Sequence, residues 1–159
     1  MLTEKQKHFL DRAIAIARAI APQYALDWRI MAAAAILESG WGESQLAQFA
    51  NNLFGIKAGR STPDAQVCAI KIQGKAERFR RYQTHEEAFH AYGRLVGQSK
   101  IYAQAREIAR DVALRELIAR IAPVYCPDDP DYALKITQLV DLIERVATPN
   151  PPEPAPASP

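Results

Sequence analysis

The chain has 159 residues, of which 20 are lysine or arginine and 18 are aspartate or glutamate, so its net charge is only +2. This length suits one domain with a sizeable buried core, and a hydrophobic content of 48% suits a soluble globular protein. The weak basic bias is compatible with an anionic polymer such as a cell wall, but it does not predict nucleic-acid binding. No run reaches the roughly 18 apolar residues of a membrane span, and the charged amino terminus does not resemble a signal peptide.

Two helices are expected in the first 40 residues. Thr3 and Gln6 form a capping-box pattern ahead of apolar residues at helical spacing, and Pro22 ends this helix. The next helix is expected to begin near Asp27, as its N-cap, and to run to about Glu38.

A single stretch of the sequence indicates strands. Apolar and polar residues alternate through "QVCAIKIQGKAERFRRY", on both sides of the turn signal Gln73-Gly74. A short two-stranded hairpin is expected here, and it must pack against helices because such a ribbon is marginal alone. The fold class is therefore mainly α, with one small β-hairpin lobe.

The rest of the chain again has helical periods. Helices are expected from a capping box at Thr84 through Val96, from Val112 to Ile121 with a stop before Pro123, and from Pro130 or Asp131 to about Val146. The proline-rich end, "TPNPPEPAPASP", cannot continue a helix or a sheet. We therefore expect a folded domain over residues 1–146 and an extended, disordered tail over 147–159.

Glu38 is the candidate catalytic residue. It stands at the expected end of its helix, since Gly40 is a natural C-terminal cap, and the negative end of the helix dipole disfavours another negative charge there. Ile36, Leu37 and Trp41 add desolvation. Both effects raise the pKa of a carboxyl group, which suits a general acid.

Four segments together show a family resemblance. The segments "ILESGWGES", "NNLFGIKA", "FRRY" and "YCPDDPDYALKI" occur in the order seen in bacterial cell-wall glucosaminidases of glycoside hydrolase family 73, which the chain resembles over about residues 5–146. The resemblance implies a lysozyme-like helical domain whose hairpin lobe forms a substrate groove. It also implies cleavage of peptidoglycan glycan strands after N-acetylglucosamine, without a cofactor or metal.

The resemblance implies roles for individual residues. Glu38 matches the general acid, and Tyr125 matches a tyrosine beside it that positions water or the N-acetyl group. The candidate substrate-binding residues are Trp41, Asn52, Phe54, Arg80 and Tyr82. Packing alone is an alternative role for Trp41 and Phe54.

A second carboxylate is harder to assign. The family pattern has an acid on the first hairpin strand, but this chain has none there, so Glu77 on the return strand is the candidate. Glu43 suits a local cap, and Asp128 and Asp129 suit caps of the last helix. The substrate's own N-acetyl group could replace a second acid, and a lytic transglycosylase would also need only Glu38.

The sequence leaves three further questions open. Cys68 and Cys126 form either one disulfide or two buried thiols, and two cysteines alone cannot make a four-ligand zinc site. The basic residues of the hairpin either bind the acidic stem peptides of peptidoglycan or form a solvated face. These residues are Lys71, Lys75, Arg78, Arg80 and Arg81. A muramidase, a lytic transglycosylase and a non-catalytic wall-binding protein are the alternative functions.

We expect a monomer that acts on the cell wall, in the periplasm or outside the cell. With no signal peptide it would be exported by a dedicated apparatus or released by lysis, as a phage lysin, a wall-remodelling enzyme or a secreted toxin. A toxin would need a cognate inhibitor or immunity protein, occupying the groove.

Overall fold

In the computed structural model, residues 1–98 and 114–147 are described. The larger elements are α1 (Glu4–Ile20), α2 (Trp28–Ser39), α3 (Gln45–Ala50), β1 (Val67–Ile72), β2 (Lys75–Arg80), α4 (His85–Gly93), a π-helical segment (Arg94–Gln98), α6 (Leu114–Tyr125) and α7 (Tyr132–Ala147). Two 3₁₀ turns, Ala21–Tyr24 and Asp64–Gln66, lie between them. The predicted class, mainly helical with a small hairpin, is confirmed.

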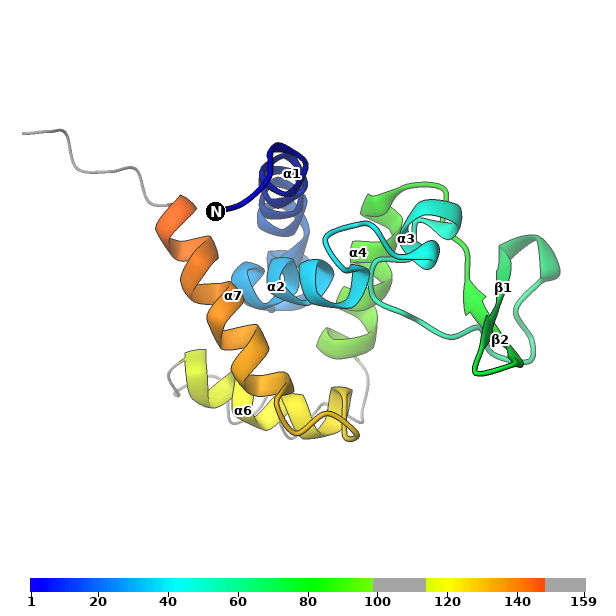
Figure 1. The fold of residues 1–159 in the computed structure, drawn as a ribbon. Coiled ribbons are helices and arrows are strands. Elements are labelled where there is room, and N and C mark those ends of the chain that lie inside the picture. The colour runs from blue at the N-terminus through cyan, green and yellow to red at the C-terminus, as the bar shows by residue number, and fades with distance from the viewer. Residues whose placement is uncertain (99–113, 148–159) are drawn as a thin grey trace, which may run out of the picture.

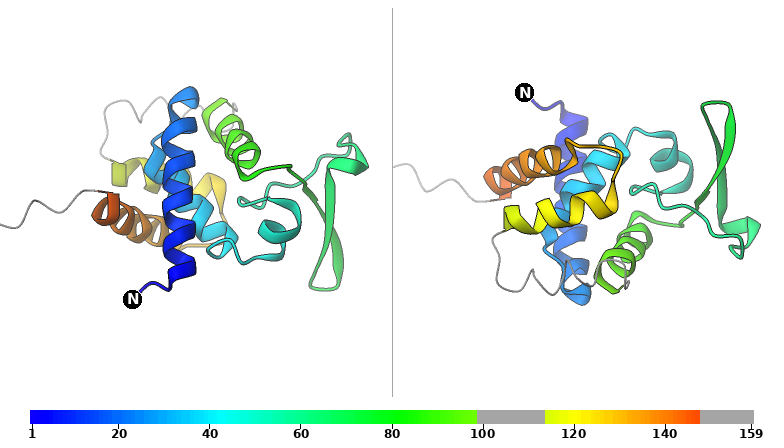
Figure 2. Two further views of the ribbon diagram at one scale, coloured as in Figure 1. Left: turned by 90° about the horizontal axis from the view of Figure 1, so that it is seen from above. Right: turned by 90° about the horizontal axis from the view of Figure 1, so that it is seen from below.

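Helix α2 is the centre of the helical body. It packs against α1 on one side and α7 on another, with α4 and α6 completing the layer around it (Figures 1 and 2). Eight of its 12 residues are buried, including the run Ala32–Ala35. A helix that is apolar on every side belongs in the interior, and alanine side chains let the neighbouring helices approach closely.

The N-terminal ends of two helices form as the sequence predicts. The Thr3 side chain accepts from the Gln6 backbone, and the Gln6 side chain accepts in return from the Thr3 backbone, which completes the capping box of α1. Asp27 caps α2 by accepting the Arg29 backbone N–H at 2.8 Å. The Arg29 guanidinium also bonds Asp27 and Glu144, and so links the start of α2 to α7.

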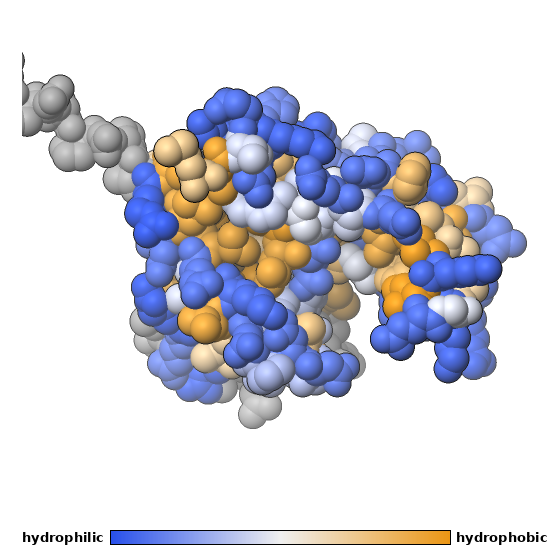
Figure 3. Space-filling model, in the orientation of Figure 1, coloured by the Kyte–Doolittle hydropathy of each residue, from blue (hydrophilic) through white to orange (hydrophobic). Residues whose placement is uncertain are grey.

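Strands β1 and β2 form the predicted antiparallel hairpin. Their two-residue turn, Gln73-Gly74, has positive φ at both positions (49° and 81°), as a type I′ turn requires. The hairpin projects from the helical body, on the side opposite the end of α7 (Figures 1 and 2). Figure 3 shows an open notch between the body and this hairpin lobe.

The observed helices differ from the sequence expectations at three places. Helix α3, capped by the Ser44 hydroxyl, was not predicted. The helix after Thr84 becomes π-helical at Arg94. Helix α6 continues through Pro123 to Tyr125, so the predicted stop is wrong: proline removes only one donor, and tertiary contacts of Tyr125 hold the last turn.

The last helix forms close to its expected start, and some expectations fall outside the described residues. The last helix begins at Tyr132, one or two residues after the predicted start. Positions 112 and 113 of the helix expected over Val112–Ile121 and residues 148–159 of the expected tail lie outside the described residues. Within the described ranges, no helix is both long enough and apolar enough to cross a membrane.

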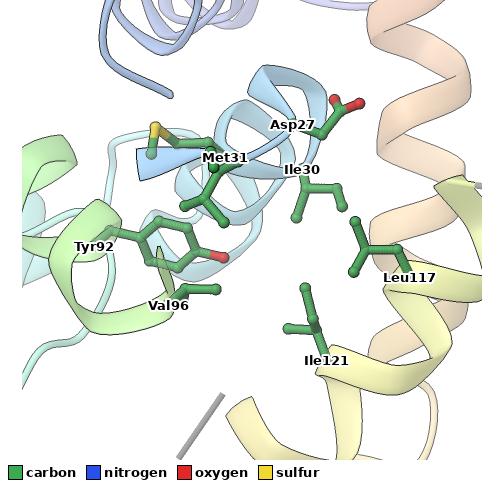
Figure 4. Close-up of a pocket in the computed structure, with 9 residues that line it drawn as sticks. Asp27, Ile30, Met31, Tyr92, Val96, Leu117 and Ile121 are labelled. Atoms are coloured by element: carbon green, nitrogen blue, oxygen red, sulfur yellow. The ribbon is translucent and has the colours of Figure 1, made fainter. Parts of the chain in front are cut away.

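A small cavity lies in the core between α2, α4 and α6. Tyr92 and Val96 face Ile30 and Ile121 across it, while the Asp27 carboxylate points away (Figure 4). Its volume is about 40 Å³ and its lining is mainly apolar. It has room for about one water molecule, not for a sugar ring, so it is a packing defect and not a substrate site.

Candidate active site

The end of α2 places Glu38 at the surface of the body through a defined hydrogen-bond pattern. Gly40, at φ 55°, donates to Leu37 O at 3.3 Å, and Trp41 donates to Ile36 O at 2.9 Å. This pair of bonds is a Schellman motif. The helix therefore ends directly after Glu38 and Ser39, and the carboxyl group belongs to a rigid last turn.

The following turn is locked to the rest of the body. The Ser39 hydroxyl, fully buried, donates to Ala35 O at 2.6 Å and accepts from Gly42 N–H at 2.7 Å. A Cβ atom on Gly42 would lie 2.5 Å from the Phe9 ring of α1, and its φ is 78°. Glycine is therefore required where the "ESGWG" turn meets α1.

The surroundings of Glu38 favour its protonated form. The side chain is half-buried, and this burial raises its pKa above the usual 4.5. The Tyr132 hydroxyl opposes the shift by donating a hydrogen bond to the carboxylate, while the negative charge of Asp129 adds to it. The direction predicted from the sequence is confirmed, and desolvation is its largest cause.

Tyrosine side chains form a continuous layer beside Glu38. Tyr132 contacts Tyr125 (5.7 Å between ring centroids), Tyr125 contacts Tyr92 (5.6 Å), and Tyr92 stacks on Phe54 (4.4 Å). The Tyr125 hydroxyl donates to Phe54 O at 3.1 Å. It is thus Tyr132, which the sequence analysis did not assign, whose hydroxyl bonds Glu38. Its place in the segment "YCPDDPDYALKI", at the start of the last helix, is the signal that could have singled it out.

Two predicted substrate-binding residues are interior residues. Asn52 is 1% exposed, and its amide bonds Ile56 O, Ile56 N and Arg80 O at 2.8–3.0 Å. Phe54 is 3% exposed and contacts Phe89 as well as Tyr92. Neither side chain has polar atoms or surface left for a sugar, so both position the cleft wall instead of binding substrate.

Trp41 lies on another side of the helix end. With Ile36, Leu37, Leu139 and Leu142 it lines a surface groove between α2 and α7, over which Figure 3 shows an apolar area. Lys135 stands at the same groove. Glu38 is not among the lining residues, so direct contact of Trp41 with the reacting sugar stays a prediction.

The acidic residues near the site differ in their ion pairs and in whether they affect the pKa of Glu38. Glu77, on β2, is ion-paired with Lys57 at 3.0 Å and is not among the charges that shift the pKa of Glu38. Asp129 does shift that pKa; ahead of α7 its carboxylate bonds Lys135 at 2.7 Å and accepts from the Asp131 backbone N–H at 3.1 Å. Glu43 pairs with Lys5 of α1.

Arg80 and Tyr82 lie together at the base of the hairpin. Both line a pocket of about 420 Å³ against α4. Cys68 in β1 and Cys126 after α6 are free thiols in separate parts of the molecule, so the disulfide alternative is wrong for this structure. Within the described residues, no group of histidine, cysteine, aspartate or glutamate has the arrangement of a metal site.

Comparison with known proteins places this geometry in a family. The family model described as mannosyl-glycoprotein endo-beta-N-acetylglucosaminidase matches residues 14–145. The peptidoglycan hydrolase FlgJ of Pseudomonas aeruginosa is 30% identical over 142 residues, 82% of this chain and 35% of its own length. The exo-glucosaminidase LytG of Bacillus subtilis is 30% identical over 145 residues, 87% of this chain and 51% of its own length.

Solved structures of related domains have the same fold. The glycoside hydrolase domain of Salmonella typhimurium FlgJ has a TM-score of 0.71 at 28% identity, covering 89% of this chain and 90% of that domain. The chain spans only about a third to a half of the full-length relatives above, so it corresponds to their glucosaminidase part. With the Glu38 helix end, the hairpin lobe and the family match together, the chain belongs to the glucosaminidase family, glycoside hydrolase family 73.

Proposed function

We propose that this protein is a peptidoglycan hydrolase that cleaves the glycan strand after N-acetylglucosamine, with Glu38 as its general acid. The observation that carries the proposal is the half-buried Glu38 carboxyl at a rigid helix end, with a raised pKa, in a chain of the glucosaminidase family. The names of the relatives, peptidoglycan hydrolase and exo-glucosaminidase, support the substrate.

The chemistry follows from the protonation state of Glu38. Its raised pKa keeps the proton on the carboxyl group to higher pH, where it can be donated to the glycosidic oxygen as the bond breaks. The Tyr132 hydroxyl then stabilises the carboxylate that remains by donating a hydrogen bond to it. Tyr125, bonded to Phe54 O, holds Tyr132 from behind by ring contact.

Glu77 is our candidate for the second carboxylate, although its ion pair with Lys57 holds it in the lobe. A base on the lobe would activate water from the face opposite Glu38 and invert the anomeric carbon. The alternative is attack by the substrate's N-acetyl group, which retains the configuration. NMR of the first product anomer, with wild type and Glu77→Gln, separates the two routes.

The direct test is digestion of purified peptidoglycan with wild type and Glu38→Gln, followed by borohydride reduction and mass spectrometry. Reduced N-acetylglucosamine ends from wild type alone are expected. Reduced N-acetylmuramic acid ends would make the protein a muramidase, and anhydro-muramic ends a lytic transglycosylase. No new ends, with retention of the protein on peptidoglycan, would overturn the enzyme assignment in favour of a wall-binding protein.

The relatives act on cell walls, which supports action in the periplasm or outside the cell. For the route and the partner we propose export by a dedicated apparatus and a cognate immunity protein in the groove. A type VI secretion effector–immunity complex from Pseudomonas protegens has the same fold over 92% of this chain, at 18% identity and a TM-score of 0.65. Protection of producer cells by a neighbouring gene product that binds the purified protein is the test.

A further inference from the structure

The pocket at the base of the hairpin has an unusual charge. We call it the arginine pocket and define it by Arg80 at the end of β2, Arg81 after it, Arg94 after α4, and Tyr82, Glu87 and His90 beside them. Three guanidiniums face one carboxylate, and Glu87 is already bonded to the Gln83 backbone N–H at 2.8 Å. His90 shares a hydrogen bond with the Tyr24 hydroxyl. The pocket therefore carries excess positive charge.

Within the described part of the chain, no acidic side chain forms an ion pair with these guanidiniums. Arg81 donates to the uncharged carbonyl of Phe49 at 2.7 Å. Across residues 1–98 and 114–147, no salt bridge includes Arg80, Arg81 or Arg94. All three side chains are exposed, so an incoming anion can reach them.

The Tyr82 hydroxyl is a second, independent sign of a ligand. It is buried, and it is the one buried side-chain oxygen or nitrogen in the described part of the chain with no hydrogen-bond partner. Unpaired buried hydroxyls are costly and call for an explanation. The charges of Arg80, Arg94 and Glu87 all act on this hydroxyl, so it lies near the charged groups of the pocket.

The arginine pocket is connected to the catalytic carboxyl through named contacts. The Asn52 amide bonds Arg80 O and holds the loop that contains Phe54. Phe54 O accepts from Tyr125, which packs on Tyr132, the donor to Glu38. The pocket is thus part of the same wall, yet none of its lining residues is among the groups that shift Glu38. A ligand group bound here therefore occupies a site separate from the Glu38 carboxyl.

We propose that the arginine pocket binds a carboxylate of the peptidoglycan stem peptide. This assignment rests on the proposed function, since it names a part of that substrate. The amino sugars of the strand carry no net charge where the peptide is attached, so the peptide carboxylates are the anions of this polymer. Guanidinium forks bind carboxylates through paired N–H donors, and the Tyr82 O–H adds a donor.

The test measures peptide binding without glycan cleavage. Labelled protein carrying Glu38→Gln is titrated with the free stem tetrapeptide, alanyl-γ-glutamyl-diaminopimelyl-alanine, and with its fully amidated form, and the NMR shifts are followed. Saturable shifts around Tyr82 are expected with the acidic peptide, and binding about tenfold weaker with the amidated one. Equal binding of both peptides would overturn the proposal.

Two double variants provide the matched comparison. Arg80→Gln/Arg94→Gln is expected to weaken binding by about tenfold, and Tyr82→Phe by about threefold. Lys71→Gln/Lys75→Gln removes the same charge at the far end of the hairpin, and is expected to change affinity less than about twofold. An equal loss of peptide affinity in the lysine control would mean that the hairpin attracts the peptide through its overall positive charge and that the arginine pocket is not a binding site. Tighter binding of poly(glycerol phosphate), lost in the arginine variant, would make it a phosphate site.

The peptide-binding results and the cleavage results test two different proposals. Peptide binding without any cleavage by wild type would leave the arginine pocket in place and overturn only the enzyme assignment. Cleavage by wild type with no peptide binding would do the reverse. In an active protein, the ratio of kcat/KM on peptide-bearing strands to that on amidase-stripped strands should fall in Arg80→Gln/Arg94→Gln and stay constant in the lysine control.

Discussion

The helical body and the hairpin lobe are stabilised in different ways. In α2, eight of 12 residues are buried, whereas in the two strands only Cys68 and Phe79 are. The lobe is held by polar links: Asn51 bonds Tyr82 O and Gln83 O, and Asn52 bonds Ile56 and Arg80. The Glu38 carboxyl thus belongs to a densely packed unit, whereas Arg80 and Tyr82 belong to a lightly attached one.

This difference implies that chemistry and substrate attachment can be perturbed separately. Dense packing fixes the position of Glu38 to the accuracy that proton transfer needs. A lobe held by a few hydrogen bonds exchanges and opens more easily than the body. Substitutions in each of the two units test this division.

Glu38→Gln should lower kcat by about 10²–10⁴-fold, because the amide cannot donate the proton that the leaving oxygen needs. The measurement is turnover of peptidoglycan strands by mass spectrometry. Binding of the strands should persist, since the lobe is untouched. Full activity in this variant would move the chemistry away from the helix end and break the comparison.

Asn52→Ala should destabilise the lobe by about 2–4 kcal/mol, because three backbone groups lose a buried partner. Hydrogen exchange should quicken in β1 and β2 and change little in α2. Asn51→Gly is the matched control, because glycine tolerates the positive φ of 50° at this position. It removes two hydrogen bonds that are more exposed than those of Asn52, so its effect should be smaller. Equal loss of protection in α2 would mean that lobe and body unfold together.

Gly42→Ala should destabilise the body by about 2–3 kcal/mol, because the added methyl group meets Phe9 at 2.5 Å in a left-handed backbone. Gly40→Ala has the same backbone strain but open space around it, and should cost about 1 kcal/mol. Thermal unfolding measures both. A similar cost at both positions would show that the contact with α1 does not constrain the turn.

Tyr132→Phe should raise the pKa of Glu38 further, because the hydroxyl that stabilises the carboxylate is lost. A general acid works while protonated, so the alkaline limb of the pH–rate profile should move to higher pH. Tyr125→Phe, whose hydroxyl bonds Phe54 O, is the control and should leave that limb in place. A shift of the limb in Tyr125→Phe alone would assign this role to Tyr125, as the sequence predicts, and not to Tyr132.

The smallest effect concerns stability and pH. Because the folded-state pKa of Glu38 lies above its unfolded value, the folded protein loses stability as pH rises through that interval. Glu38→Gln removes this loss, so its melting temperature should exceed that of wild type at pH 7. The two proteins should converge at acid pH, below the usual carboxyl pKa of 4.5. A variant that is less stable at pH 7 would contradict the burial of the charge.

Local patterns were sufficient for much of the fold. The Thr3 and Asp27 caps, the Gln73-Gly74 turn and the Gly40 helix end each depend on residues within one or two turns of the chain. The candidate site could be predicted from the sequence only in part. Glu38 follows from its helix end, but the contact of Tyr132 with Glu38 depends on how α6 and α7 pack, and the predicted role of Tyr125 stays a prediction. The continuation of α6 past Pro123 has the same origin, since contacts at Tyr125 outweigh one missing donor.

Local sequence signals account for the helical class, the hairpin and its turn, and the carboxyl at the end of an apolar helix, because caps, turns and periodicity are local properties. The interior position of Asn52 and Phe54, and the meeting of Arg80 and Arg94 near Tyr82, follow instead from how the elements pack. These residues come from separate elements, and their burial and partners exist only once the lobe is seated on the helical body.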